Sequence, residues 1–160
     1  MPLLFLFFSC LHPNTSENLP INIDSYQKIL QKQDLPIGTP ISNGIQTPVE
    51  TEFGIWQLSI QYFPEKKILY LAINNYLWLD SSSNVQSTVF SMTQMLTQNH
   101  SMLGGKFQLN PSSGAITIGT ELVAFETFSE EEIQHSIEVL ILLAKDNYPM
   151  LDAALQSRFY

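Results

Sequence analysis

The chain has 160 residues, 44% of them hydrophobic, and its seven basic and 15 acidic side chains give a formal net charge of −8. This length is typical of one domain that buries a core of its own. Nucleic-acid affinity comes largely from lysines and arginines that neutralise phosphates, so the few and scattered cations argue against a nucleic-acid partner.

Residues 1–21 are expected to form an irregular leader or tail ahead of a single α+β domain over 22–160. The apolar run Leu3–Phe8 is far shorter than the roughly 20 residues that span a bilayer, and no basic region marks it as a signal peptide. It either packs against the domain or its partner, or is irregular. Cys10 is the only cysteine, so no intramolecular disulfide is possible. Export with a lipid anchor through Cys10 is a minor alternative.

The first half of the predicted domain begins with a short helix and continues as strands. Asn22 or Asp24 can cap a helix whose apolar stripe ends near Gln33. Residues 36–51 hold three prolines and two glycines, which predicts a loop. Alternating apolar side chains over 55–62 then predict a strand with one buried face.

A second strand of this half is predicted to lie at the centre of the sheet. Residues Ile68–Ile73 are continuously apolar, which is typical of a strand covered on both faces. The pair Asn74–Asn75 is expected to break it, and Tyr76–Leu79 to start a further short strand. Residues 80–84 are predicted to form a loop.

The second half is predicted to hold a helix over Val85–Gln98, a hairpin over 106–118 and two closing helices. The hairpin signal is a five-residue connection that ends in a glycine. Ser129 with Glu132 forms a capping box for a helix that reaches Ala144. A last helix is expected to begin near Pro149. The predicted order is α-β-β-(β)-α-β-β-α-α.

No set of residues forms a catalytic, metal or cofactor site by its spacing. The three histidines, His12, His100 and His135, are isolated from one another, whereas metal sites need clustered ligands. The acidic run Glu130–Glu132 is explained by helix capping. Trp56 and Trp78 are interpreted as core residues, with a ligand pocket as the alternative. We therefore expect no enzyme, metal or cofactor.

The helix over 85–98 carries the one feature that points to recognition. Val85, Val89, Met92 and Leu96 follow one stripe, and further apolar side chains lie off it, so the helix is apolar around much of its circumference. Methionine-rich surfaces adapt to varied protein partners, although methionine is equally an ordinary core residue. The candidate dimer or partner interface consists of Val85, Val89, Phe90, Met92, Met95 and Met102.

Several of these features together resemble a known family. In the second half of the chain, a helix with Met95 and Leu96 leads into Gly104–Gly105. It is followed by the segments Lys106–Asn110 and Ile116–Ile118, a helix with a Ser-x-x-Glu cap, and the sequence Tyr148-Pro-Met-Leu. In the first half of the chain, the segment Trp56–Ile60 follows an initial helix and fits the same pattern. This pattern over about 22–156 resembles the type III secretion chaperone-like fold, and within it the YbjN-type branch. Two parts do not match that pattern: the long proline-rich segment 36–51 and residues 1–21.

The resemblance implies a two-layer α+β protein whose bent antiparallel sheet is flanked by helices. It also implies a homodimer with the 85–98 helix near its interface, and a chaperone-like or regulatory protein-binding role in the bacterial cytoplasm. No catalytic or cofactor residues are carried over from the family. The alternative is a small-molecule-binding protein or small enzyme with a pocket between sheet and helices, around Trp56 and Trp78. Only 14% of the residues of the chain are charged, and 12 glutamines and 10 asparagines equal them in number. Such a weakly charged chain with apolar helices favours burial of some of its surface between subunits.

Overall fold

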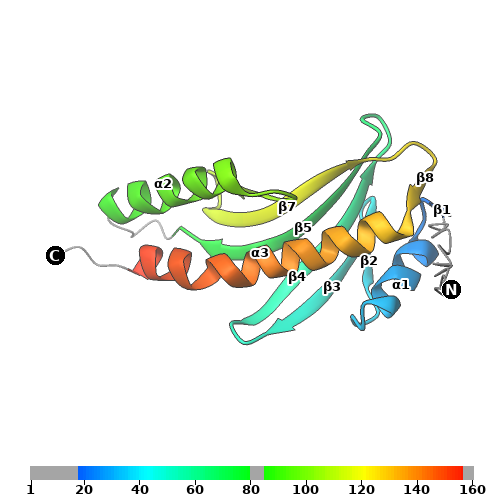
Figure 1. The fold of residues 1–160 in the computed structure, drawn as a ribbon, viewed down its shortest axis with the longest axis horizontal. Helices are drawn as coiled ribbons and strands as arrows, with labels where there is room; N and C mark the ends of the chain where they lie inside the picture. Colours follow the sequence, from blue (N-terminus) through cyan, green and yellow to red (C-terminus); the bar gives the residue numbers. More distant parts are fainter. Residues whose placement is uncertain (1–17, 80–84, 157–160) are drawn as a thin grey trace, which may run out of the picture.

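The computed structural model describes residues 18–79 and 85–156. Its centre is a bent, six-stranded antiparallel sheet with the strand order β2-β3-β4-β5-β7-β6 (Figure 1), and β1 and β8 form a separate two-stranded sheet. This is the α+β architecture that the sequence predicts. The strands are β1 (Asn18–Pro20), β2 (Thr39–Ile41), β3 (Gly44–Thr51), β4 (Gly54–Phe63), β5 (Ile68–Trp78), β6 (Lys106–Leu109), β7 (Ala115–Val123) and β8 (Thr127–Ser129). The helices are α1 (Ile23–Lys32), α2 (Val85–Ser101) and α3 (Glu130–Gln156).

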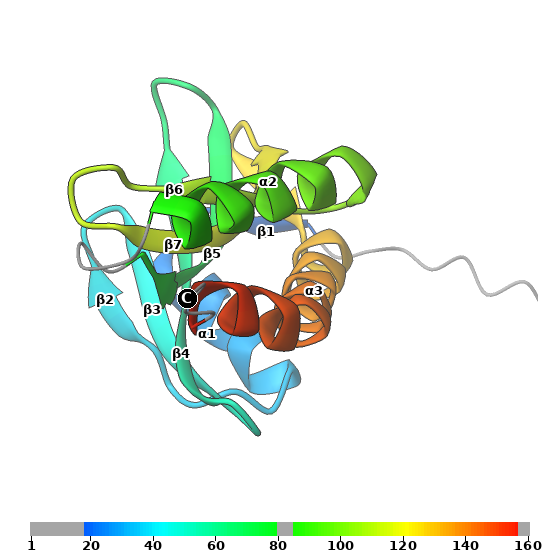
Figure 2. The same cartoon turned by 90° about the vertical axis from the view of Figure 1, so that its left-hand side faces the viewer.

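The three helices lie against one side of the sheet, and the core fills the space between the two layers (Figure 2). The long helix α3 contributes a stripe of fully buried side chains, and the central strands β4, β5 and β7 contribute branched residues that face it. Burying such apolar surface is the main favourable term in folding. The fully buried residues of α3 are Ile133, Ile137, Leu140, Ala144 and Leu151.

Residues 36–51 are not a loop, and this correction has a physical reason. They form β2 and β3, of which β3 pairs with β4 along its whole length from Gly44 to Thr51. Beyond Gln46, β2 no longer covers β3, so the rest of β3 is an edge of the sheet. Pro48 lies on this edge, where no strand on the outer side would accept a backbone hydrogen bond, so the missing N–H of proline is tolerated.

The break predicted at Asn74–Asn75 is also wrong. Strand β5 runs through it to Trp78, with an irregularity in its pairing with β7 between Ile73 and Leu77. Asn75 has a φ of 52°, and asparagine tolerates this left-handed conformation better than most residues. The polar pair therefore places a bulge inside a long strand instead of ending it.

The two closing helices are one helix. Helix α3 continues through Pro149, which lacks the N–H of a regular helical turn. Residues on both sides of the proline, among them Ala144 and Leu151, are buried in the same core. We infer that this shared burial outweighs the local cost of the proline.

The predicted helix N-caps at Asn22 and Ser129 and the predicted hairpin over 106–118 are confirmed. The side chain of Asn22 accepts a hydrogen bond from the backbone of Ser25 at 2.9 Å, and Ser129 accepts one from the backbone of Glu132 at 3.3 Å. Strands β6 and β7 form the predicted hairpin, whose turn ends at Gly114 with a φ of 71°. Strand β1 lies within the segment expected to be a leader and pairs with β8.

Candidate protein-binding surface

Helix α2 is attached to the domain through one side only. Met95 is 6% exposed and Ser91 is fully buried, and both face the core. At the end of the helix, the side chain of Asn99 donates to the carbonyl of Phe107 at 2.9 Å and accepts from the amide of Phe107 at 2.6 Å. This pair of hydrogen bonds joins α2 to β6. Because these contacts hold one side of the helix, the opposite side faces outward.

The outward side of α2 carries an exposed apolar stripe. It consists of Val85, Val89, Met92 and Leu96, which are 77%, 57%, 40% and 69% exposed, and we call it the α2 stripe. A helix brings positions i, i+4, i+7 and i+11 onto one face. Phe90, 43% exposed, lies beside the stripe. The helix contains no Asp, Glu, Lys or Arg, although an outer helix face is normally charged or polar.

The structure separates the six predicted interface residues into two groups. Val85, Val89, Phe90 and Met92 are exposed, as a partner contact requires. Met95 is part of the core and Met102 packs against it, so the two methionines contribute mainly to the fold of the single chain. Two further exposed side chains extend the apolar surface: Leu96, whose position on the stripe is readable from the sequence, and Leu103, which is 88% exposed.

The two tryptophans differ in burial. Trp56 is 4% exposed and packs among aromatic rings, including Tyr76 with 5.3 Å between ring centroids, which confirms it as a core residue. Trp78 is 54% exposed, so its prediction as a core residue is wrong. It lies near the end of β5, where the chain leaves the sheet. Three surface hollows border strands and loops of the sheet, and neither tryptophan lines any of the three.

Among residues 18–79 and 85–156, no group of three or more His, Cys, Asp or Glu side chains is placed to hold a metal ion. His100 and His135 are both exposed, on α2 and α3. Within the same ranges, no helix is long and apolar enough to cross a bilayer. His12 and Cys10 lie outside the described residues.

The acidic run at the start of α3 has a role that its sequence does not reveal. The side chain of Glu130 is only 6% exposed and lies within 3.4 Å of the Lys28 ammonium. Lys32 and Gln134 also donate to its Oε1. The hydrogen bond from Lys32, with the charges of both lysines, holds the pKa of Glu130 below its usual range. Glu130 therefore ties α1 to α3, in addition to lying in the first helical turn.

We expect this contact to make the free energy of unfolding fall as the pH is lowered into the acid range. A carboxyl with a lowered folded pKa stabilises the fold above its unfolded pKa of about 4.3, and that contribution is lost as the pH falls through the folded pKa. Denaturant titrations from pH 7 to pH 3 should show a smaller acid loss of stability for Glu130→Gln than for the wild type. At pH 7 the variant should be less stable by about 1–3 kcal/mol. If Glu130→Gln loses as much stability between pH 7 and pH 3 as the wild type, then Glu130 does not contribute to the acid dependence. Glu131→Gln, on the exposed side of the same turn, is the control.

Comparison with known proteins shows the fold. No protein-family model matches the chain, and no curated protein matches its sequence. A chain in the crystal structure of the ExsC–ExsE complex is similar, with a TM-score of 0.56, 11% sequence identity, and coverage of 81% of this chain and 92% of that one. A chain in the structure of the HopA1–SchA chaperone–effector complex has a TM-score of 0.50 and 10% identity, covering 79% of this chain and 97% of that one.

The fold is type III secretion chaperone-like. This confirms the fold class predicted from the hairpin, the helix cap and the apolar pattern. Neither structure bears on the YbjN-type branch, which stays a prediction. At 10–11% identity the likeness concerns the fold, and the function is argued from the surface of this chain.

Proposed function

We propose that the protein is a non-enzymatic, chaperone-like protein-binding module of the bacterial cytoplasm that acts as a homodimer through the α2 stripe. The observation that carries the proposal is this stripe of exposed apolar side chains on a helix without a charged residue. Monomeric soluble proteins rarely expose contiguous apolar patches of such a kind without a partner. The stripe extends over the twelve residues from Val85 to Leu96, about 17 Å at a rise of 1.5 Å per residue step.

A second copy of the chain is the occupant that the stripe favours. The chain carries a net charge of −8, so two copies repel each other at long range. The α2 stripe lacks charge, and pairing two such helices places no like charges opposite each other at the contact. Interface cores are similarly depleted in charged residues and enriched in methionine and aromatic side chains.

A protein partner for the dimer is supported by the kind of complexes in which the fold occurs. One similar structure is described as a chaperone–effector complex. We infer that this chain also holds another protein, and that the partner is a polypeptide instead of a small molecule.

The test of the dimer is the mass of the protein in solution. We expect light scattering to give twice the 18.2 kDa of one chain for the wild type, and a single-chain mass for the double variant Val89→Asp, Met92→Asp. Both side chains are exposed in the single chain, so the two substitutions together should lower the free energy of unfolding by no more than about 1 kcal/mol.

Thr97→Asp is the matched control, because Thr97 is exposed on the same helix and lies off the stripe. It should leave the mass unchanged. A wild-type mass of one chain, or a double variant that stays dimeric and folded, would contradict the proposed dimer.

A further inference from the structure

Strand β7 has an unpaired edge beyond the start of β6. Strand β6 covers that side of β7 only as far as Gly119, which pairs with Lys106. Within the described part of the chain, no strand pairs with the segment Thr120–Val123 on this side. An unpaired edge presents backbone N–H and C=O groups that can accept an extended peptide.

The backbone hydrogen bonds of β7 show which groups of this edge are free. The amide of Ala124 donates to the carbonyl of Lys67 at 2.9 Å, so it points toward β5. Backbone groups of successive residues in a strand point to opposite sides. The N–H and C=O groups of Glu121 and Val123 therefore point away from β5, and among the described residues none bonds to them on that side.

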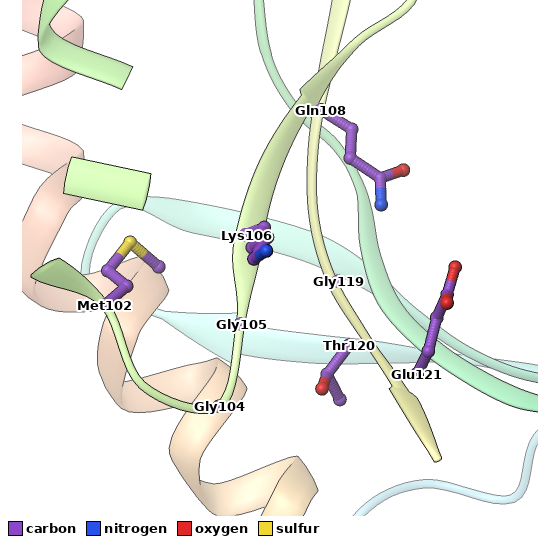
Figure 3. A pocket seen from close by; sticks show the side chains of 8 residues that line it. All are labelled: Met102, Gly104, Gly105, Lys106, Gln108, Gly119, Thr120 and Glu121. Atoms are coloured by element: carbon purple, nitrogen blue, oxygen red, sulfur yellow. The ribbon is translucent and has the colours of Figure 1, made fainter. Parts of the chain in front are cut away.

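A hollow of about 450 Å³ lies beside this edge. The chain before β6 leaves the line of the strand at Gly104, which has a φ of 84°. Figure 3 shows the resulting gap, with Gly104 and Gly105 on one wall and Thr120 and Glu121 of β7 on the other. The hollow therefore continues the line of β6 along the free edge of β7.

The side chains that line the hollow include one cation and one carboxylate, Lys106 and Glu121. Each precedes an apolar side chain of the core layer, Phe107 or Leu122, so both point to the opposite, open face of the sheet. Neither forms a salt bridge with another described residue. This pair of free charges suits a ligand that carries an anion and a cation of its own.

We propose that this hollow binds the free C-terminus of a partner polypeptide whose last residue is lysine or arginine. A strand added in the line of β6, with the same direction, runs antiparallel to β7 and ends where β6 begins. Since β6 occupies the line ahead, a chain that ends at this point fits it better than one that must continue. Capture of a terminal carboxylate and addition of a strand to a sheet edge are both recurring modes of peptide recognition.

The register of β6 and β7 places each group of this C-terminus. Lys106 pairs with Gly119, so the last residue, two positions before Lys106 in the line, lies opposite Glu121. Its N–H and one carboxylate oxygen bond to the backbone of Glu121. The other carboxylate oxygen lies toward the Lys106 ammonium, and the basic side chain faces the Glu121 carboxylate. The two preceding residues lie opposite Leu122 and Val123, which suits apolar side chains.

This inference rests on the protein-binding part of the proposed function and uses a surface other than the α2 stripe. Calorimetry with the synthetic peptide acetyl-Ser-Thr-Thr-Val-Leu-Arg tests it. The free acid should bind at one peptide per chain, and its C-terminal amide should bind about tenfold more weakly or worse. Lys106→Met should weaken binding of the acid to the same extent and leave the affinity for the amide unchanged. Lys66→Met, at an exposed lysine of a neighbouring hollow, is the control and should change neither affinity.

Two further comparisons test the charge pair and the strand. A peptide that ends in leucine should bind more weakly than the arginine peptide to the wild type, but equally well to Glu121→Gln. N-methylation of the last residue removes the donor to the Glu121 carbonyl and should cost about tenfold in affinity. The same change at the second-last residue, whose N–H points away from β7, should have little effect.

The opposite results overturn the proposal. Equal affinities for acid and amide, or for the two N-methylated peptides, would show that neither the terminal carboxylate nor the strand edge is recognised. Absence of binding by wild-type chains that light scattering shows to be dimeric would rule out this site while the proposed dimer stands. Lys106 and Glu121 are exposed, so their variants should keep the circular dichroism spectrum of the wild type.

Discussion

Replacing Met95 with aspartate should abolish the folded protein, whereas the same change three residues earlier, at Met92, should leave it folded. Met95 is 6% exposed and belongs to the core, while Met92 is 40% exposed on the α2 stripe. A carboxylate at position 95 would be buried in an apolar core without a compensating charge, which lowers the free energy of unfolding by roughly 4 kcal/mol or more. That is comparable to the whole free energy of unfolding of a domain at the lower end of the typical range of about 5–15 kcal/mol.

Circular dichroism with urea titration measures this difference. Met95→Leu, which conserves volume, is the control and should cost less than about 1.5 kcal/mol. Equal stability of the two aspartate variants would contradict the assignment of opposite faces of α2 to the core and to a partner. Because Met95→Asp removes the fold, its loss of binding would say nothing about the interface.

Replacing Gly44 with alanine should destabilise the sheet by about 3 kcal/mol or more. A Cβ atom at this position would lie 1.9 Å from the carbonyl oxygen of Ile60 and 2.8 Å from the Cα of Gln61. Both atoms belong to the backbone of β4, which pairs with β3 at this point. Since no side-chain rotation relieves the contact, the strands must separate or the backbone must shift, and strain of this kind is among the costliest effects of a single substitution.

Gln46→Ala, two residues along the same strand, is the control for Gly44→Ala. Gln46 is half-buried, so its truncation should cost less than about 1 kcal/mol. The measurement is the free energy of unfolding from urea titration. If Gly44→Ala is as stable as Gln46→Ala, then β3 does not pair with β4 in the described register.

The elements predicted well from the sequence are those with strong local signals. The alternation along β4, the five-residue turn before β7 and the caps at Asn22 and Ser129 are each determined by neighbouring residues. These signals specify local structure without tertiary context. They also carry the resemblance that identified the fold.

The errors arise where tertiary packing outweighs local propensity. Prolines and glycines over 36–51 indicate a loop, but Pro48 lies at a sheet edge where it is tolerated, and Gly44 lies where two strands come too close for a Cβ atom. Pro149 indicates a helix start, but the core holds one helix straight through it. Such contexts are not visible from a single sequence.

The candidate surface was only partly predictable. The spacing of Val85, Val89, Met92 and Leu96 marks a stripe, yet a stripe of this kind normally faces the core. Which side of α2 faces inward depends on Met95 and on the hydrogen bonds from Asn99 to β6. Because α2 is apolar on both sides, its sequence alone does not determine which side faces the core.

The distance between two copies of α2 tests the central claim most directly. In a Cys10→Ser chain, a spin label at Thr93→Cys lies on the exposed part of α2 beside the stripe. The axes of paired helices lie about 8–10 Å apart, so pulsed electron paramagnetic resonance should detect two labels within about 30 Å of each other. A label at Ile37→Cys, an exposed residue just before β2, which lies at the opposite edge of the sheet from β6, should give a longer distance. Absence of the short distance at Thr93, or a short distance at Ile37 instead, would contradict a homodimer formed through the α2 stripe.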